Sequence, residues 1–127
     1  MINLPDPVRV FLHTPATDLR KGFDALSGLV TTTFGQDPTS GHLFLFVNRR
    51  RDRLKILYWD RDGLAIWYKR LETGSFQIPA TATDAVSIEM TPTQLSLILA
   101  GIDLGSARQR KRYQRPTPVA ENRPFPS

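Results

Sequence analysis

Apolar residues recur along this chain at two spacings, and each spacing predicts a different kind of element. Residues 8–13 (VRVFLH) follow two prolines and are rich in β-branched and aromatic side chains, which favours a strand. From Thr17 onward, apolar residues recur every three to four positions, as they do on one face of a helix. Thr17 or Asp18 is suited to cap this helix, and Gly35 is suited to end it.

Three more apolar runs predict strands at residues 42–48, 53–60 and 64–71, and residues 86–90 predict a further short strand. A second helix is predicted after Thr91-Pro92, because threonine caps helices well and proline suits the first helical position. Its apolar stripe continues to Gly101. We expect an α+β fold: an antiparallel sheet of three to five strands, an N-terminal helix packed on one face, a short C-terminal helix and a flexible basic tail.

The turn DRDG at residues 60–63 predicts how its two strands pair. Asp first and Gly fourth suit a type I turn followed by a left-handed glycine, which places Asp60 opposite Leu64. Because side chains alternate across a sheet, this register divides the hairpin into two faces. The face expected in the core carries Leu54, Ile56, Tyr58, Leu64, Ile66 and Tyr68. The other face combines cations with both indole rings and carries Arg53, Lys55, Trp59, Trp67 and Lys69.

Positive charge is distributed unevenly along the chain, whose net charge is +5. Residues 1–103 carry 11 Lys and Arg against 11 Asp and Glu, whereas residues 104–127 carry 6 against 1, so the tail holds the whole excess. The tail also contains four of the ten prolines and few large apolar residues, a composition typical of disorder. We therefore expect a single α+β domain at residues 1–103 and a disordered, basic, Pro-rich tail at residues 104–127.

Several classes of site are disfavoured by composition. The absence of cysteine excludes disulfides, thiolate nucleophiles and cysteine-bound zinc, and His13 and His42 lie too far apart for a zinc motif. No phosphate loop, nucleophile elbow or dinucleotide fingerprint is present, so we expect neither a cofactor nor an enzyme. No apolar run reaches the roughly 20 residues of a membrane span, and no secretion signal is present, so we expect a soluble cytoplasmic protein.

A metal-dependent nuclease is the one catalytic alternative that the sequence leaves. Asp18, Asp24 and Asp37 have the oxygen ligands that Mg²⁺ prefers. Asp18 and Asp24 are six positions apart on the predicted helix, however, and would point in different directions. We therefore predict no catalytic residue and no metal site.

Within the neutral body, positive charge is concentrated in one stretch, where five of the seven residues 49–55 are cationic. Turns favour Gly, Asn, Asp and Ser, so turn chemistry alone does not explain four arginines in five positions. Guanidinium groups bind phosphate oxygens and release counterions, whereas the structural alternative is that the charges only prevent pairing of sheet edges. The nucleic-acid-binding residues predicted in the body are Arg49, Arg50, Arg51, Arg53, Lys55, Lys69 and Arg70.

Two other groups of residues have functional interpretations. Trp59 and Trp67 are able to stack on bases or contact a partner, although tryptophan is more often simply buried. The tail resembles a flexible basic arm that binds a nucleic-acid backbone without reading sequence. Its predicted contact residues are Arg108, Arg110, Lys111 and Arg112.

Several strings of this sequence resemble one protein family. They are TDLRKGFDAL (17–26), SGHLFLF (40–46), NRRRDRLKILYWD (48–60) and WYKRLE (67–72), followed by Gly74 and Phe76. Together they resemble the TnpB-type accessory protein, or Orf2-like family, of the sixty-six group of bacterial insertion sequences. The resemblance covers residues 7 to 103. It implies a small protein encoded beside a separate DDE-type transposase, needed for efficient transposition and without established catalytic activity of its own.

From these observations we expect a noncatalytic transposition accessory protein that contacts DNA, at the element ends or at a strand intermediate, through the Arg-rich turn and the tail. The resemblance assigns no binding residues, so those positions rest on the physical argument alone. The alternative from another class is an adaptor that docks on the transposase of the same element, with the tryptophan face as its contact surface. The expected partners are DNA and the transposase, with no membrane, and the sequence assigns no oligomeric state.

Overall fold

The α+β prediction is confirmed by a computed structural model, which describes residues 7–79 and 84–101. The elements are β1 (Val10–His13), α1 (Phe23–Leu29), the π-helical turn η1 (Val30–Phe34), β2 (Leu43–Val47), β3 (Arg53–Asp60), β4 (Gly63–Arg70), β5 (Ser87–Met90) and α2 (Pro92–Ala100). The predicted basic tail lies outside the described residues. No helix in the described ranges is long and apolar enough to cross a membrane.

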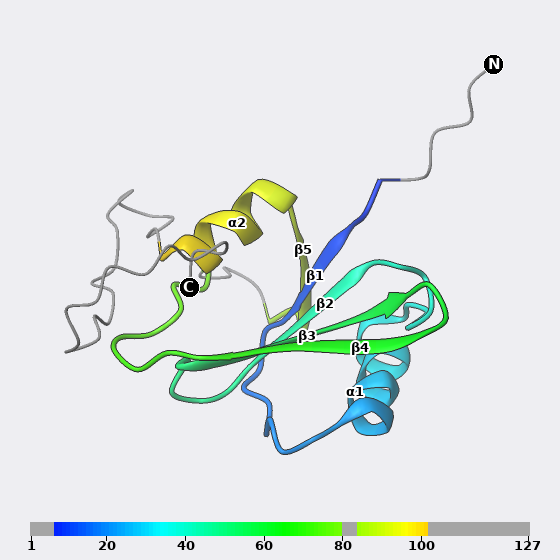
Figure 1. Cartoon of the computed structure of the whole chain (residues 1–127), viewed down its shortest axis with the longest axis horizontal. Helices are drawn as coiled ribbons and strands as arrows, with labels where there is room; N and C mark the ends of the chain where they lie inside the picture. The colour runs from blue at the N-terminus through cyan, green and yellow to red at the C-terminus, as the bar shows by residue number, and fades with distance from the viewer. Residues whose placement is uncertain (1–6, 80–83, 102–127) are drawn as a thin grey trace, which may run out of the picture.

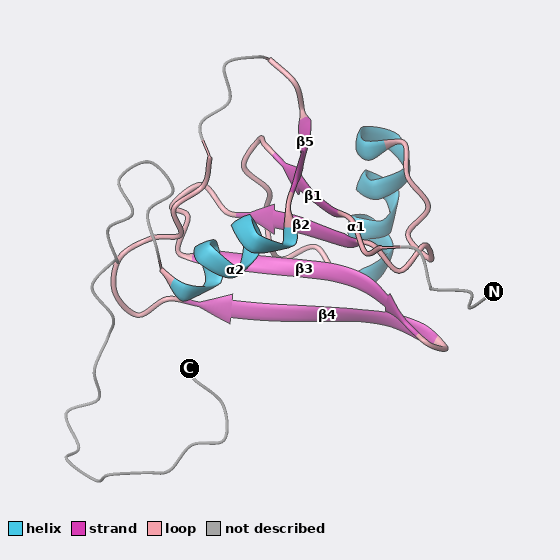
Figure 2. Cartoon of the chain, turned by 90° about the horizontal axis from the view of Figure 1, so that it is seen from above, coloured by secondary structure: helices cyan, strands magenta, loops and turns pink. Residues whose placement is uncertain are grey.

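The strands form one five-stranded sheet in the order β4-β3-β2-β1-β5 (Figure 2). Strands β1 and β2 pair in parallel, with Val10 opposite Leu43, and the other neighbours pair antiparallel. The predicted antiparallel sheet is therefore wrong for this pair. The reason is topological: α1 and η1 lie between β1 and β2 in the chain, and such a crossover connection joins parallel strands.

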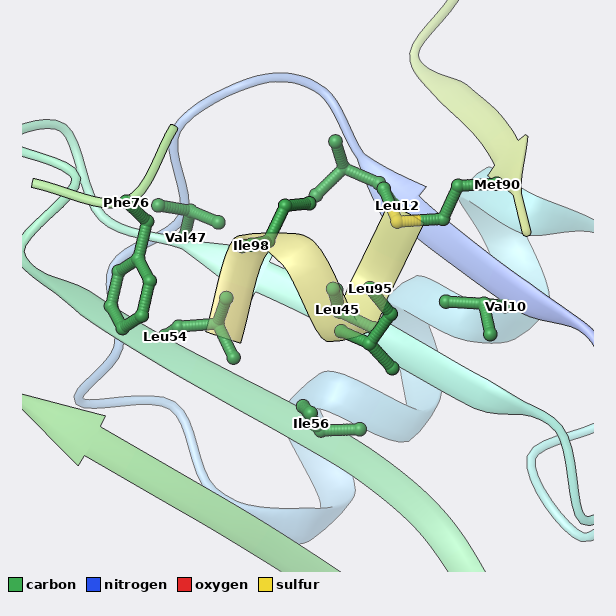
Figure 3. Packing of buried hydrophobic residues seen from close by; sticks show 10 residues of the cluster. All are labelled: Val10, Leu12, Leu45, Val47, Leu54, Ile56, Phe76, Met90, Leu95 and Ile98. Atoms are coloured by element: carbon green, nitrogen blue, oxygen red, sulfur yellow. The ribbon is translucent and has the colours of Figure 1, made fainter. Parts of the chain in front are cut away.

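The two helices lie on opposite sides of the sheet (Figure 1). Because strand side chains alternate, each strand supplies residues to both faces. The cluster on the α2 side is formed by Val10, Leu12, Leu45, Val47, Leu54, Ile56, Phe76, Met90, Leu95 and Ile98 (Figure 3). The cluster on the α1 side is formed by Phe11, Leu19, Leu26, Val30, Phe44, Phe46 and Leu57. The central strands β1, β2 and β3 are thus buried on both faces, whereas no residue of the edge strand β4 is fully buried.

Helix α1 begins later than the sequence predicts. Its N-cap is Gly22, which makes no side-chain capping bond, so the prediction of Thr17 or Asp18 as the cap is wrong. The Asp18 carboxylate instead accepts a hydrogen bond from the backbone N–H of Arg20 at 3.0 Å, a local alternative to helical bonding. The predicted end is confirmed, because Gly35 is left-handed with φ 62°.

Helix α2 begins and ends as predicted. Thr91 caps it in a capping box with Gln94, Pro92 occupies the first turn, and Gly101 ends it with φ 81°. Its buried residues Leu95 and Ile98 face the sheet (Figure 3).

The hairpin of β3 and β4 pairs one residue away from the predicted register. Asp60 lies opposite Gly63 rather than Leu64, because Arg61 takes the positive φ of 59° and closes a two-residue loop. A slip of one residue moves every β4 side chain to the other face. The α1 side therefore carries Arg53, Lys55, Leu57, Trp59, Leu64, Ile66, Tyr68 and Arg70. The predicted division of this hairpin into faces is wrong for β4.

Candidate nucleic-acid interface

The Arg-rich turn between β2 and β3 is held in shape by its two non-arginine polar residues. Asn48 Nδ2 donates a hydrogen bond to Asp52 Oδ1 at 2.7 Å, and Asn48 Oδ1 accepts one from the Arg53 N–H at 3.0 Å. The Arg51 N–H donates to the Asn48 carbonyl at 3.0 Å and closes the turn. The conformation therefore depends on Asn48, Asp52 and the backbone rather than on guanidinium groups.

A second set of bonds fixes the turn against the rest of the domain. The Leu71 N–H donates to the Asp52 carbonyl at 2.7 Å, and the Phe76 N–H donates to the Arg51 carbonyl at 2.6 Å. Phe76 is fully buried in the α2-side cluster. The turn is thus anchored to the segment that follows β4, which gives its arginines a defined position.

The segment before α1 lies beside this turn, because the Thr17 N–H donates to the Val47 carbonyl at the end of β2 at 2.8 Å. Between the two segments lies a pocket of about 550 Å³, which we call the arginine pocket. It is lined by Ala16, Thr17, Asp18, Leu19, Arg20, Asn48, Arg49, Arg50, Arg53 and Tyr68. Residues more than 25 positions apart in the chain therefore meet at one site.

Four arginines and one carboxylate give the arginine pocket a positive balance. Asp18 accepts hydrogen bonds from the Arg20 guanidinium, the closest at 2.7 Å, and these bonds lower the pKa of Asp18 to about 2. Arg20 is thereby partly neutralised by a carboxylate that stays ionised at neutral pH. Among the described residues, Arg49 and Arg50 form no ion pair, so their charges are available to an anion.

Lys55 is buried and does not line the pocket. Its side chain is only 9% exposed, and Nζ donates to the Lys21 carbonyl at 2.9 Å. The same Nζ lies 4.8 Å from the ring centroid of Tyr68, its cross-strand partner on β4. Lys55 therefore links β3 to the segment before α1 and to Tyr68.

The other predicted contact residues are distributed around the turn. Arg51 is exposed but does not line the pocket. Arg70 is on the α1 side and pairs with Glu72 at 2.9 Å, whereas Lys69 is on the opposite face of β4. The tail residues Arg108, Arg110, Lys111 and Arg112 lie outside the described residues.

The two tryptophans do not share a surface. Trp59 is on the α1 side, where its Nε1 donates to the Arg61 carbonyl at 3.1 Å, and Trp67 is on the α2 side and 39% exposed. The predicted face that combined both indoles with cations does not exist, because that face depended on the register that the structure corrects.

Among the charged and aromatic residues that line the pocket, three are not predicted as contact residues from the sequence: Asp18, Arg20 and Tyr68. Asp18 and Arg20 belong to the string TDLRK, in which the sequence indicates a family resemblance, a possible helix cap and a possible Mg²⁺ ligand at Asp18, but no contact with nucleic acid. Tyr68 was assigned to the core by the register error. Only the correct pairing of β4 could have brought it to the site.

No metal site is found in the part of the chain that the structure describes, where no group of three His, Cys, Asp or Glu residues gathers. Asp24, on α1, and Asp37, in the loop before β2, do not line the arginine pocket with Asp18. The pocket instead presents guanidinium, amide and phenol groups, which bind anions and aromatic rings.

His13 supports the wall of the pocket and makes stability depend on pH. It is buried, its Nδ1 lies 3.0 Å from Thr17 Oγ1, and burial lowers its pKa below the ordinary 6.5. The unfolded chain therefore takes up a proton first, so the free energy of unfolding should fall as pH drops below about 6.5, by at most about 1.4 kcal/mol per pH unit. Urea unfolding at pH 7.5 and 5.5 measures this difference in the free energy of unfolding.

The variant His13→Gln is the control for this prediction. It should lose less stability between these two pH values than the wild type, because it has no imidazole to protonate. The carboxylates with lowered pKa, such as Asp18 and Glu89, contribute stability above their ordinary values near 4 and lose it only at lower pH. Equal losses in both proteins would contradict the assignment to His13.

The sequence of this chain matches one family of known proteins. A family model described as IS66 Orf2 like protein matches residues 8–109, six residues beyond the expected end of the resemblance at residue 103. The uncharacterized protein y4jC of Sinorhizobium fredii is 37% identical over 94% of this chain and 100% of its own length. The uncharacterized protein y4hO of the same organism is 38% identical over 88% of this chain and 93% of its own. No solved structure matches the chain significantly. The chain therefore belongs to the IS66 Orf2-like family, which implies an accessory role in the transposition of a bacterial insertion sequence.

Proposed function

We propose that this protein assists transposition without catalysing it, by holding the phosphate backbone of DNA at the arginine pocket. The observation that carries the proposal is the meeting of Arg49, Arg50 and Arg53 with Arg20 around one pocket. A guanidinium group presents donors in a planar fork that matches two phosphate oxygens, so several arginines around one hollow suit a phosphate chain.

The arginine side chains of the turn are not needed to stabilise its conformation. Asn48 and Asp52 close it, and Arg51 takes a positive φ of 59°, a conformation that disfavours a residue with a Cβ. Among the described residues, no carboxylate pairs with Arg49 or Arg50. Uncompensated cations at a rigid site are expected of a surface that binds an anion.

The remaining predicted residues take different roles in this proposal. Lys55 positions Tyr68 and the Lys21 carbonyl instead of contacting DNA, because it is buried. Arg51 and Arg70 extend the positive surface beside the pocket. The tail residues Arg108, Arg110, Lys111 and Arg112 add affinity that does not depend on sequence, because cations contact the phosphates that every sequence shares.

The DNA that we propose is the end of the element, and the proposed protein partner is the transposase of the same element. An adaptor that docks on the transposase through both tryptophans is less well supported, because Trp59 and Trp67 lie on opposite faces. Association with the transposase that is lost on nuclease treatment would indicate bridging by DNA. Association that survives nuclease would indicate direct docking.

The proposal is tested by separating the pocket from the tail in the full-length chain. A variant with Arg108, Arg110, Lys111 and Arg112 changed to glutamine should bind duplex DNA more weakly than the wild type but retain a measurable salt dependence. Fluorescence anisotropy with labelled element ends and random duplexes, at 50 to 200 mM salt, measures both quantities. If this variant lost all DNA binding, the tail rather than the pocket would be the site.

A further inference from the structure

Tyr68 gives the arginine pocket a second kind of surface. Its side chain is 48% exposed although the residue lies within a strand, and it lines the pocket beside Arg49, Arg50 and Arg53. An exposed aromatic ring next to guanidinium groups is the combination with which proteins hold unpaired bases, because the ring stacks on the base while cations hold the phosphate.

The ring of Tyr68 is held in place but has one side open. Lys55 Nζ lies 4.8 Å from its centroid on the side of β3, and its hydroxyl accepts a long bond of 3.5 Å from Arg53 Nη1. Strand β4 is at the edge of the sheet, and within residues 7–79 and 84–101 no strand pairs along its outer side. The ring is therefore oriented by two cations and accessible from the sheet edge.

The form of the DNA decides whether a base can stack on Tyr68. The arginine pocket is an open hollow of about 550 Å³, a volume on the scale of a small molecule. A duplex is bound along a surface, and its base faces are covered by their neighbours in the stack. Away from the ends of a duplex, only an unpaired base offers a face to Tyr68.

We infer that the arginine pocket receives an unpaired nucleotide of single-stranded DNA, with its phosphate held by Arg49, Arg50 and Arg53 and its base stacked on Tyr68. This inference rests on the proposed DNA contact and deepens it, because it specifies which form of DNA is held. A frayed element end or a cleaved strand offers such a nucleotide.

The test compares a labelled oligodeoxythymidylate with a labelled random duplex. Tyr68→Leu should weaken binding of the single strand by about fivefold to 100-fold, the range for loss of one stacked base, and should change duplex binding by less than about twofold. Tyr68→Phe keeps the ring and should bind the single strand as the wild type does. The matched control is Trp67→Leu, which removes an exposed ring from the opposite face of the same strand and should change neither affinity.

A second measurement uses the wild-type protein directly. The fluorescence of 2-aminopurine within the single strand should fall when the wild type binds, because stacking quenches it, and should fall less with Tyr68→Leu. Unchanged fluorescence on binding, or an equal loss of single-strand and duplex affinity in Tyr68→Leu, would overturn the inference. Neither outcome affects the proposed backbone contact. That contact fails if changing Arg49, Arg50 and Arg53 to serine leaves the salt dependence of duplex binding unchanged, or if the tail variant loses all DNA binding.

Discussion

Changing Arg49, Arg50 and Arg53 together to serine is expected to flatten the salt dependence of duplex DNA binding by about 2.7 in log–log slope. Each phosphate contact contributes a slope of about 0.9, so loss of three contacts gives this difference. Between 50 and 200 mM salt, the wild type should therefore lose about 40-fold more affinity than the variant. The variant should fold normally, because Asn48 and Asp52 supply the side-chain bonds of the turn.

Two variants distinguish the effect of a cation's position from its effect on net charge. Arg50→Asn removes one cation from the pocket, and Arg61→Asn removes one from the loop at the other end of β3, roughly 25 Å away along an eight-residue strand. Asparagine tolerates the positive φ of Arg61, so neither change should disturb the backbone. Only Arg50→Asn should reduce the slope, by about 0.9. Equal slopes for the two variants would mean that net charge, and not the pocket, determines binding.

The elements of this fold could be predicted from local patterns, and the errors arose where pairing depends on distant residues. Helix α2 was predicted correctly because Thr91, Pro92 and Gly101 are local signals that agree. The parallel pairing of β1 with β2 follows from the crossover through α1 and η1, but it also requires that the two strands are neighbours in the sheet, which no local pattern shows. The start of α1 was missed because Asp18 satisfies a backbone N–H in a turn as readily as at a helix cap.

The candidate site was predicted only in the part that is contiguous in sequence. Arg49, Arg50 and Arg53 are visible as a cluster, but their meeting with Arg20 requires the bond between Thr17 and Val47. The sequence assigns Tyr68 to the core because Gly63 is the residue expected in the left-handed conformation. In the structure, Arg61 adopts that conformation instead. An arginine with positive φ is uncommon, so turn statistics favour the wrong register by one residue. That single residue decides whether Tyr68 belongs to the core or to the pocket.

Phe44→Ala is expected to lower the free energy of unfolding by about 3 to 5 kcal/mol, the largest effect on stability that we predict. Phe44 is 0% exposed on β2, a strand with neighbours on both sides. Its ring stacks on Phe11 at a centroid distance of 5.6 Å and contacts Phe34 at 5.4 Å. Truncation leaves a cavity between the sheet, η1 and α1 that neighbouring rings cannot fill. Urea denaturation measures the loss.

The matched control is Phe23→Ala, which removes the same atoms from a ring that is 49% exposed at the start of α1. It should lower the free energy of unfolding by about half as much or less, because about half of this ring already faces water. DNA binding by Phe44→Ala should match the wild type at low temperature, where the folded fraction is high, and fall as the variant unfolds. This follows because Phe44 does not line the arginine pocket and acts on it only through the sheet. Similar losses of stability for the two phenylalanine variants would contradict the burial of Phe44 against Phe11 and Phe34.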